Sequence, residues 1–440
     1  MDRLRRLFRS EPPAYEPIEG GEQGDEAQNE EKFSWIEYSI FFLLGIAMLW
    51  AWNMFLAAAP YFQHRFASSE WILTHFQSAI TSVSCVTNLG SMIVLTKLQS
   101  GASYPKRIAA ALLLNTITFT LLAISTTSFR SVTAGGYFGF LLTMVCATSL
   151  STGLSQNGVF AYVTGFGRGE YTQAIMAGQA VAGVLPCVAQ IVSVLSVSQE
   201  AAEDGSAQES PKSAFAYFLT ATGISSISFV AFMYFVERHR KQRQLKRVVE
   251  DIHEAEGEEQ AERKVVGLWS LFKKLHWNAG AVFMCFAVTM VFPVFTQAIL
   301  SVRDPEHSSR IFQPASFIPL GFLVWNIGDL IGRLLTLHPR LKILHYPRML
   351  FVFSIARVIF IPLYLLCNMY GKGAVISSDF FYLVVVQLFF GLSNGYLGSS
   401  CMMSAGEWVE VEEREAAGGF MGLFLVAGLT VGSLLSFLAA

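Results

Sequence analysis

Apolar stretches of about 20 residues recur along the whole chain, separated by short polar connections. Each stretch is long enough to cross a hydrocarbon core of about 30 Å as an α-helix. The stretches begin near Trp35, Trp71, Lys106, Tyr137, Tyr171, Ala214, Trp277, Ala315, Tyr346, Asp379 and Ala416. This pattern predicts a polytopic membrane protein with about eleven transmembrane helices.

Two polar tracts interrupt the apolar pattern and suggest how the chain is divided. Residues 1–34 are rich in Pro, Gly and Glu, which predicts a disordered tail. Residues 237–275 are basic and then acidic, which predicts a charged, partly helical linker. The expected domains are therefore a six-helix bundle over 35–236 and a five-helix bundle over 276–440.

Lys and Arg, rather than the net charge of −2, predict the orientation. Basic clusters precede the first span and follow the second, the sixth and the eighth, so all four lie on one side. We expect that side to be cytoplasmic, with the N-terminus inside and the C-terminus lumenal or extracellular. An acidic run before the last helix, from Glu407 to Glu415, departs from this trend.

The N-terminal tail contains a short candidate sorting signal. Tyr15-Glu16-Pro17-Ile18 fits the pattern of a tyrosine and a bulky residue three positions later, which sorting adaptors bind as an extended peptide. Pro17 favours that extended backbone. Tyr15 and Ile18 therefore favour a vacuolar or other endomembrane over the plasma membrane, although four-residue matches also arise by chance.

The sequence gives no sign of an enzyme, a metal site or a bound cofactor. The six cysteines lie singly in apolar spans, without metal-ligand spacing. No glycine-rich segment ends in the Lys-Ser or Lys-Thr of an ATP-binding loop. These observations argue against an ATP-driven pump.

Asp329 and Arg333 place opposite charges four residues apart inside the eighth span. Either charge alone in hydrocarbon costs about 2.5 to 3.5 kcal/mol, so such residues normally face a bundle interior or a watered cavity. The spacing puts both on one helix face. The pair indicates either a substrate pathway or a structural ion pair between helices.

Other polar and aromatic residues lie within the spans. Trp52, in the first helix, could stack on a flat ligand or pack against lipid and helices. Gln156, in the fourth, offers an amide suited to a base edge or to an interhelical hydrogen bond. Small residues such as Gly178 allow close helix contacts.

Several segments, in this order along the chain, resemble the equilibrative nucleoside transporter family, including its fungal members. The matching segments are Trp52-Asn53, Gln156 with residues 171–179, Phe292-Pro293, Asn326-x-x-Asp329-x-x-Gly332-Arg333, residues 357–368, Ser393-Asn394-Gly395 and residues 415–418. They span the length of the membrane portion.

The resemblance implies roles for individual residues. Trp52 and Gln156 would contact the nucleobase, and Asp329 and Arg333 the ribose hydroxyls. Asn326 shares the face of Asp329. Phe292 and Pro293 would border the pocket. The remaining candidates, with structural or gating roles, are Asn53, Arg357, Asn394 and Gly178.

The expected fold class is an all-α membrane protein with about eleven helices in a 6+5 arrangement of major-facilitator-like, pseudo-symmetric bundles. The resemblance implies transport of nucleosides, with nucleobases as an alternative substrate, by alternating access and facilitated diffusion. A proton-coupled nucleoside transporter of an acidic organelle and a carrier of another small polar solute remain alternatives. The expected partners are membrane lipid and a sorting adaptor, but no nucleic acid polymer.

Overall fold

The computed structural model describes residues 33–99, 102–129, 131–196, 211–253, 266–304 and 307–439. Tyr15 and Ile18 lie outside the described residues. Within these ranges, eleven helices are long and apolar enough to cross a membrane, which confirms the predicted number. Three of these spans join successive helices: α10 (Leu268–Thr289) with α11 (Val291–Ala298), α13 (Pro347–Ala356) with α14 (Phe360–Leu365), and a π-helix (Phe381–Leu388) with α15 (Phe389–Ser404).

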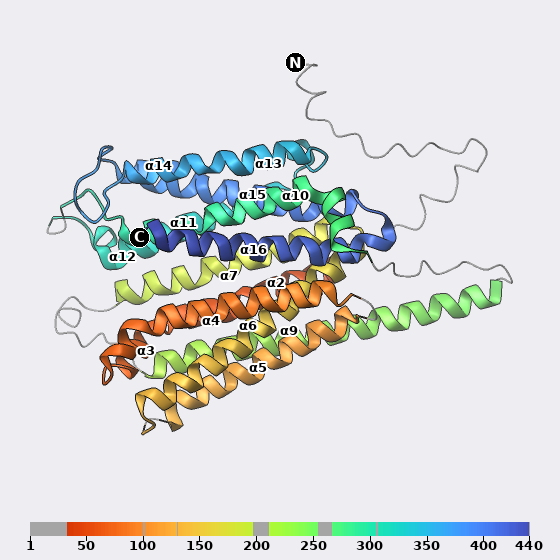
Figure 1. Ribbon diagram of the computed structural model, residues 1–440, viewed down its shortest axis with the longest axis horizontal. Helices are drawn as coiled ribbons and strands as arrows, with labels where there is room; N and C mark the ends of the chain where they lie inside the picture. Colours follow the sequence, from red (N-terminus) through yellow and green to blue (C-terminus); the bar gives the residue numbers. More distant parts are fainter. Residues whose placement is uncertain are drawn as a thin grey trace, which may run out of the picture.

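The elements follow one another along the chain and run along a common direction in Figure 1. They are α2 (Trp35–Ala57), α3 (Ala59–Arg65), α4 (Glu70–Lys97), α5 (Tyr104–Ser128), α6 (Ala134–Gly165), α7 (Gly169–Ser196), α9 (Pro211–His253), α10 (Leu268–Thr289), α11 (Val291–Ala298), α12 (Pro314–Leu335), α13 (Pro347–Ala356), α14 (Phe360–Leu365), a π-helix (Phe381–Leu388), α15 (Phe389–Ser404) and α16 (Arg414–Ala439).

The helix starts agree with the apolar pattern to within three residues, except at the seventh span. We expected that span to begin near Trp277, whereas α10 begins at Leu268. The difference arises because Lys273 and Lys274 resemble a solvated linker. Lys274 is instead paired with the acidic run, since its Nζ lies 2.6 Å from Glu413 Oε2.

The break between α10 and α11 has a local cause in the sequence. Proline has no backbone N–H, so Pro293 cannot donate the helical hydrogen bond to the carbonyl of Thr289. The first helix ends at Thr289, and the next begins at Val291. The seventh span is therefore interrupted at Met290, between the two helices.

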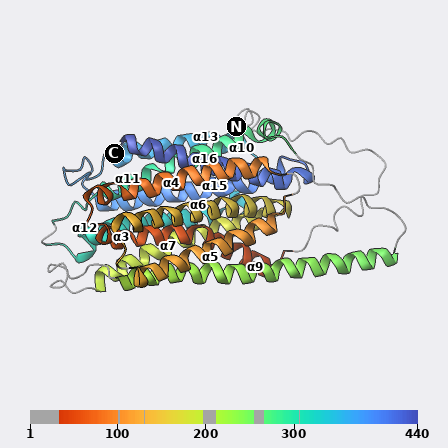
Figure 2. The same cartoon turned by 60° about the horizontal axis from the view of Figure 1, so that its bottom comes forward.

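Helix α7 lies between the N-terminal and C-terminal groups of helices. In Figure 1, α10 to α16 occupy the upper part of the view and α2 to α6 with α9 the lower part. α7 packs extensively against α2 on one side and α12 on the other. Figure 2 shows that α9 continues well past the end of the bundle.

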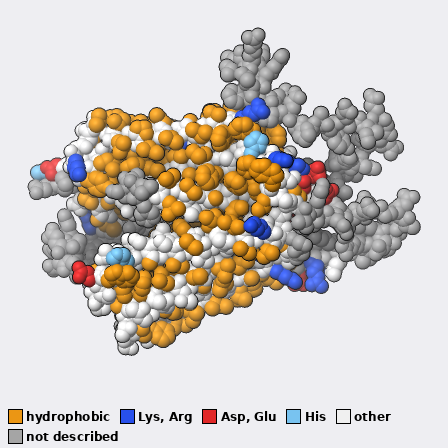
Figure 3. Space-filling model, in the orientation of Figure 1, with side chains coloured by type: hydrophobic (Ala, Val, Ile, Leu, Met, Phe, Trp, Pro, Cys, Tyr) orange, Lys and Arg blue, Asp and Glu red, His pale blue; other side chains and the backbone are white. Residues whose placement is uncertain are grey.

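The outer surface of the bundle is apolar between its two ends. Figure 3 shows hydrophobic side chains over the middle of the visible face, and charged side chains mainly near the two ends. Large apolar side chains such as Val86, Ile227 and Val230 are 74%, 61% and 67% exposed. Such a belt fits a membrane, because these exposed apolar side chains would face lipid hydrocarbon rather than water.

The contact between α2 and α7 depends on glycines that let two backbones touch. A Cβ on Gly178 would meet the carbonyl oxygen of Phe42 and approach Ile46 N to 2.9 Å. On the other side of the contact, a Cβ on Gly45 would meet the carbonyl oxygen of Ile175. Backbone atoms cannot move away as a flexible side chain can, so neither position has room for a side chain.

Replacing Gly178 with valine should therefore separate α2 from α7. We expect Gly178→Val to destabilise the protein by about 1 to 3 kcal/mol or more, as overpacking does, measured as a lower midpoint of thermal unfolding in detergent. Gly223→Val on α9 is the matched control, because a Cβ there meets nothing within 4 Å. Equal midpoints for the two variants would contradict the close contact.

Candidate functional site

Asp329 and Arg333 form an enclosed ion pair on one face of α12. Arg333 Nε lies 2.7 Å from Asp329 Oδ2, and the two side chains are only 6% and 3% exposed. The other carboxylate oxygen, Oδ1, accepts a hydrogen bond of 2.7 Å from Asn394 Nδ2 on α15. Both oxygens of Asp329 thus have protein partners, as a buried carboxylate requires.

Arg333 also reaches across to α7. Its Nη1 donates to the carbonyl oxygen of Met176 at 2.6 Å and to Gln179 Oε1 at 3.3 Å. In the opposite direction, Gln173 Nε2 donates to the carbonyl oxygen of Arg333 at 3.2 Å. The ion pair therefore lies where the N-terminal and C-terminal groups of helices meet.

A chain of polar contacts continues from Asp329 to Arg357. Asn394 Oδ1 accepts from Thr289 Oγ1 at 2.6 Å, and Arg357 Nη2 donates to the same hydroxyl oxygen at 3.0 Å. Arg357 Nε donates to Ser393 Oγ at 3.1 Å, and its guanidinium lies 4.7 Å from the ring centroid of Phe390. The charge of Arg357 is thus accommodated by α10 and α15. Thr289 carries no sequence signal of its own, because its partner Asn394 is 105 residues away.

Direct backbone contact between α12 and α15 positions Asn394 beside Asp329. A Cβ on Gly395 would meet the carbonyl oxygen of Asp329. From the other side, a Cβ on Gly328 would meet the carbonyl oxygen of Leu388. Glycine at both positions brings the two helices close enough for the short amide side chain to reach the carboxylate.

Asn53 and Asn326 approach the same level of α7 from opposite sides. Asn53 Nδ2 donates to the carbonyl oxygen of Ala182 at 2.6 Å. Asn326 Nδ2 donates to the carbonyl oxygen of Phe322 at 2.8 Å, and its Oδ1 occupies the space that a Cβ on Gly183 would fill. The first and eighth spans therefore meet α7 at two consecutive residues.

Aromatic rings lie next to this level on the C-terminal side. The ring of Phe292 stacks on that of Trp325, with centroids 4.1 Å apart and planes at 14°. Phe322 meets Phe292 edge to face at 5.0 Å. Trp325 was not among the residues that the sequence singled out for a site, and its buried Nε1 has no hydrogen-bond partner among the described residues. Pro293 is half-buried beside this stack.

Gln156 lies on α6, where the backbone of this helix approaches α16. Its side chain is buried, and its backbone oxygen lies 3.8 Å from where a Cβ on Gly422 would be. Within the described part of the chain, Gln156 Oε1 has no hydrogen-bond partner. No hydrogen bond among these residues joins Gln156 to Asp329 or Arg333. The neighbouring Asn157 accepts from Arg107 Nη1 at 2.6 Å.

The predicted residues thus differ in how accessible they are. Trp52, Asn53, Asn326 and Pro293 are half-buried, whereas Asp329, Arg333, Arg357, Asn394, Gln156 and Phe292 are buried. The half-buried amides and indole can meet a ligand directly. The ion pair can do so only by giving up bonds that it makes to protein.

Comparison of the sequence with known protein families identifies the family of this chain. A family model described as nucleoside transporter matches residues 142–440, which is more than half of the chain. The chain belongs to the nucleoside transporter family. It is an integral, multi-pass membrane transporter of the equilibrative type, and not an enzyme.

Two curated relatives illustrate the similarity over nearly the full length. Nucleoside transporter FUN26 of Saccharomyces cerevisiae is 30% identical, over 92% of this chain and 84% of that protein. Equilibrative nucleoside transporter 2 of Homo sapiens is 26% identical, over 90% of this chain and 95% of that protein. The predicted resemblance is confirmed.

Solved structures show the same fold with little sequence identity. The proton:xylose symporter XylE of the major facilitator superfamily has a TM-score of 0.62 and 11% identity, covering 91% of this chain and 87% of that chain. The E. coli fucose:proton symporter FucP has a TM-score of 0.54 and 13% identity, covering 92% of each chain. The predicted major-facilitator-like architecture is confirmed.

Removing one charge of the buried pair should cost more than removing both. In Arg333→Gln, Asp329 keeps an enclosed charge without its guanidinium, which typically costs about 3 to 5 kcal/mol. We expect a large fall in the thermal midpoint of the purified protein, and a partial recovery in the double variant Asp329→Asn/Arg333→Gln, where no charge is left unpaired. Strictly additive losses would contradict the coupling of the two side chains.

Proposed function

We propose that a nucleoside binds at mid-membrane between the two groups of helices, with its base near α2 and α6 and its ribose near α12. The observation that carries this proposal is the meeting of Asn53 and Asn326 at Ala182 and Gly183 of α7. Because Trp52 is next to Asn53, this meeting places Trp52 at the same level as Asn326, one turn before Asp329. A ligand there would touch both groups of helices, as a carrier that alternates between two openings requires.

Trp52 and Gln156 are the proposed contacts of the nucleobase. Trp52 is half-buried, and within the described residues no other aromatic ring occupies its faces. An indole face can stack on any planar base. The partnerless Oε1 of Gln156 is an acceptor suited to an exocyclic amine on the base. The two side chains would thus supply stacking and a directional hydrogen bond.

Asp329 and Arg333 are the proposed contacts of the ribose, with Asn326 on the same face and Phe292 and Pro293 bordering the pocket. In the structure the pair is bonded to Asn394, Met176 and Gln179. Sugar hydroxyls both donate and accept, so they can replace these partners without leaving either charge uncompensated. Arg333 would then give up its hydrogen bonds to α7 in the same step in which the substrate binds.

Alternating access is the proposed mechanism, with the N-terminal six and C-terminal five spans rocking about the α7–α12 contact. Near each of the two ends of this contact, one arginine donates hydrogen bonds to α7. Arg333 bonds to Met176 and Gln179, and Arg310 Nη1 and Nη2 donate to the carbonyl oxygens of Leu195 and Val194 at 3.2 and 3.1 Å. Exchange of bonds at one end at a time would open one side of the carrier.

The proposed orientation has the N-terminus in the cytoplasm and the C-terminus in a lumen or outside. It is supported by basic residues at the ends of successive spans, including Lys97, Lys106 and Arg240, which the positive-inside rule assigns to the cytoplasm. A vacuolar or other endomembrane is the proposed location, with a sorting adaptor bound at Tyr15 and Ile18.

Removal of the tyrosine motif tests that location. We expect Tyr15→Ala/Ile18→Ala, expressed as a fluorescent fusion, to move from internal membranes to the cell surface, because an adaptor would lose both of its anchor side chains. A fusion carrying Glu16→Ala alone should keep the native distribution. Unchanged localisation of the double variant would exclude the motif as the signal.

Trp52 provides the sharpest test of the substrate site. Loss of one base stack costs about 1 to 3 kcal/mol, so Trp52→Ala should raise the half-saturating concentration of labelled uridine or adenosine roughly 5- to 150-fold. Uptake is measured in proteoliposomes, with adenine as a competitor to test whether ribose is required.

Trp50 is the matched control for this measurement. It lies two residues away, and its Nε1 donates to Thr220 Oγ1 of α9 at 3.3 Å, on the side of α2 away from the proposed site. We expect Trp50→Ala to keep near-native half-saturation. Equal changes in the two variants would remove Trp52 from the site, and saturable uptake of neither nucleoside by the native chain would contradict the proposed substrate class.

A further inference from the structure

A groove runs along α10 on the outer face of the C-terminal group of helices, away from the proposed substrate site. It has a volume of about 390 Å³. Apart from His276 of α10, its lining residues are Phe272, Trp277, Gly280 and Phe283 of α10, Phe351 of α13 and Phe424 of α16. All of them are half-buried, as expected for side chains that face hydrocarbon.

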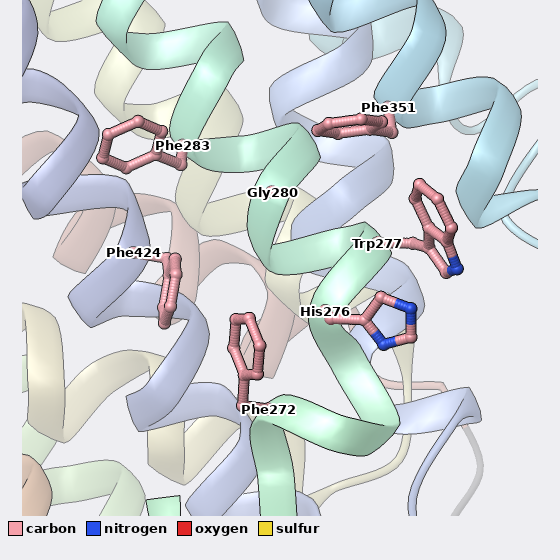
Figure 4. Close-up of a pocket in the computed structure, with 7 residues that line it drawn as sticks. All are labelled: Phe272, His276, Trp277, Gly280, Phe283, Phe351 and Phe424. Atoms are coloured by element: carbon pink, nitrogen blue, oxygen red, sulfur yellow. The ribbon is translucent and has the colours of Figure 1, made fainter. Parts of the chain in front are cut away.

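Gly280 makes the floor of the groove, and aromatic rings make its walls. Figure 4 shows Phe283 and Phe424 on the α16 side of α10, and Phe351 with Trp277 on the α13 side. A Cβ on Gly280 would already approach the ring of Phe351 to 3.0 Å. Any larger side chain at this position would therefore fill the space between the two walls.

The length of the groove matches one leaflet of a bilayer. Phe272 and Phe283 are eleven residues apart on a helix, a distance of roughly 17 Å at about 1.5 Å per residue. Half of a hydrocarbon core of about 30 Å is about 15 Å. A single acyl chain running from the membrane interface to the bilayer centre would therefore fit along it.

A lysine, an arginine and a histidine lie near the interfacial end of the groove. His276 lines it and is exposed, and Lys273 follows Phe272. The Arg348 guanidinium lies 5.8 Å from the ring centroid of Trp277. Lys274 forms an ion pair with Glu413. Within the described part of the chain, Lys273 and His276 form no ion pair. The rim thus presents positive charge where a lipid headgroup would lie.

We propose that this groove is a binding site for an anionic glycerophospholipid. One acyl chain lies on Gly280 between the aromatic walls, and the headgroup phosphate meets Lys273, His276 and Arg348. Charge complementarity at the rim selects an acidic headgroup over a zwitterionic one, and the apolar walls select the chain. The site is separate from nucleoside binding, so it can be tested without a transport assay.

Photolabelling of the full-length protein in nanodiscs tests the proposal. The probes are phosphatidylserine and phosphatidylcholine with a diazirine in one acyl chain, and labelled peptides are mapped by mass spectrometry. We expect phosphatidylserine to label the α10 segment around Gly280 at least about fivefold more than phosphatidylcholine does. Equal labelling by the two lipids would overturn the selectivity for an acidic headgroup.

Two variants separate the rim from the floor. Lys273→Gln/Arg348→Gln should reduce phosphatidylserine labelling to the level of phosphatidylcholine, whereas Lys97→Gln/Lys106→Gln, which removes two exposed lysines near the connection between α4 and α5, should not. Gly280→Leu should reduce labelling by both lipids to the level seen on other outer faces. Gly223→Leu, on an outer glycine with open space around it, is its control.

The rim variant keeps the test decisive if Gly280→Leu disturbs the fold, since Lys273 and Arg348 are exposed side chains whose loss should leave the core intact. Unchanged phosphatidylserine labelling in Lys273→Gln/Arg348→Gln would overturn the headgroup site. Unchanged labelling by both lipids in a folded Gly280→Leu would overturn the groove.

Discussion

The guanidinium of Arg333 is the constraint on which the centre of this molecule depends. A charge in a low-dielectric interior must be compensated and hydrogen-bonded, and here the ion pair of Arg333 with Asp329 and its hydrogen-bond partners involve three helices. Asp329 lies on the same helix, Met176 and Gln179 on α7, and Asn394 completes the carboxylate from α15. Three elements that are far apart in sequence are therefore held in one arrangement.

The glycines around this centre make its short bonds geometrically possible. An asparagine side chain reaches Asp329 only because Gly328 and Gly395 let the backbones of α12 and α15 touch. In a membrane, helix association cannot rely on hiding apolar surface from water, so close backbone packing and interhelical hydrogen bonds must supply much of the cohesion. The same few positions thus determine both the cohesion of the C-terminal helices and the geometry of the polar centre.

Hydropathy predicted the spans because a bilayer leaves a chain few alternatives to the helix. It also gave the shared face of Asp329 and Arg333, since that depends only on helical spacing. The start of α10 was predicted too late, because Lys273 and Lys274 were judged by composition, and the compensation of Lys274 by Glu413 spans 139 residues. For the same reason no local pattern could reveal the role of Thr289, whose partner Asn394 is 105 residues away. Contacts between distant segments depend on packing, which periodicity does not encode.

The continuity of α9 has a mechanical consequence. Its membrane span, Lys212–Gln242, passes without interruption into a helix that continues to His253 beyond the bundle. A helix bends little over such a length unless proline or a bulge interrupts it, and this one has no proline after Pro211. Any tilt of the N-terminal helices would therefore be amplified at the tip of α9, as at the end of a lever.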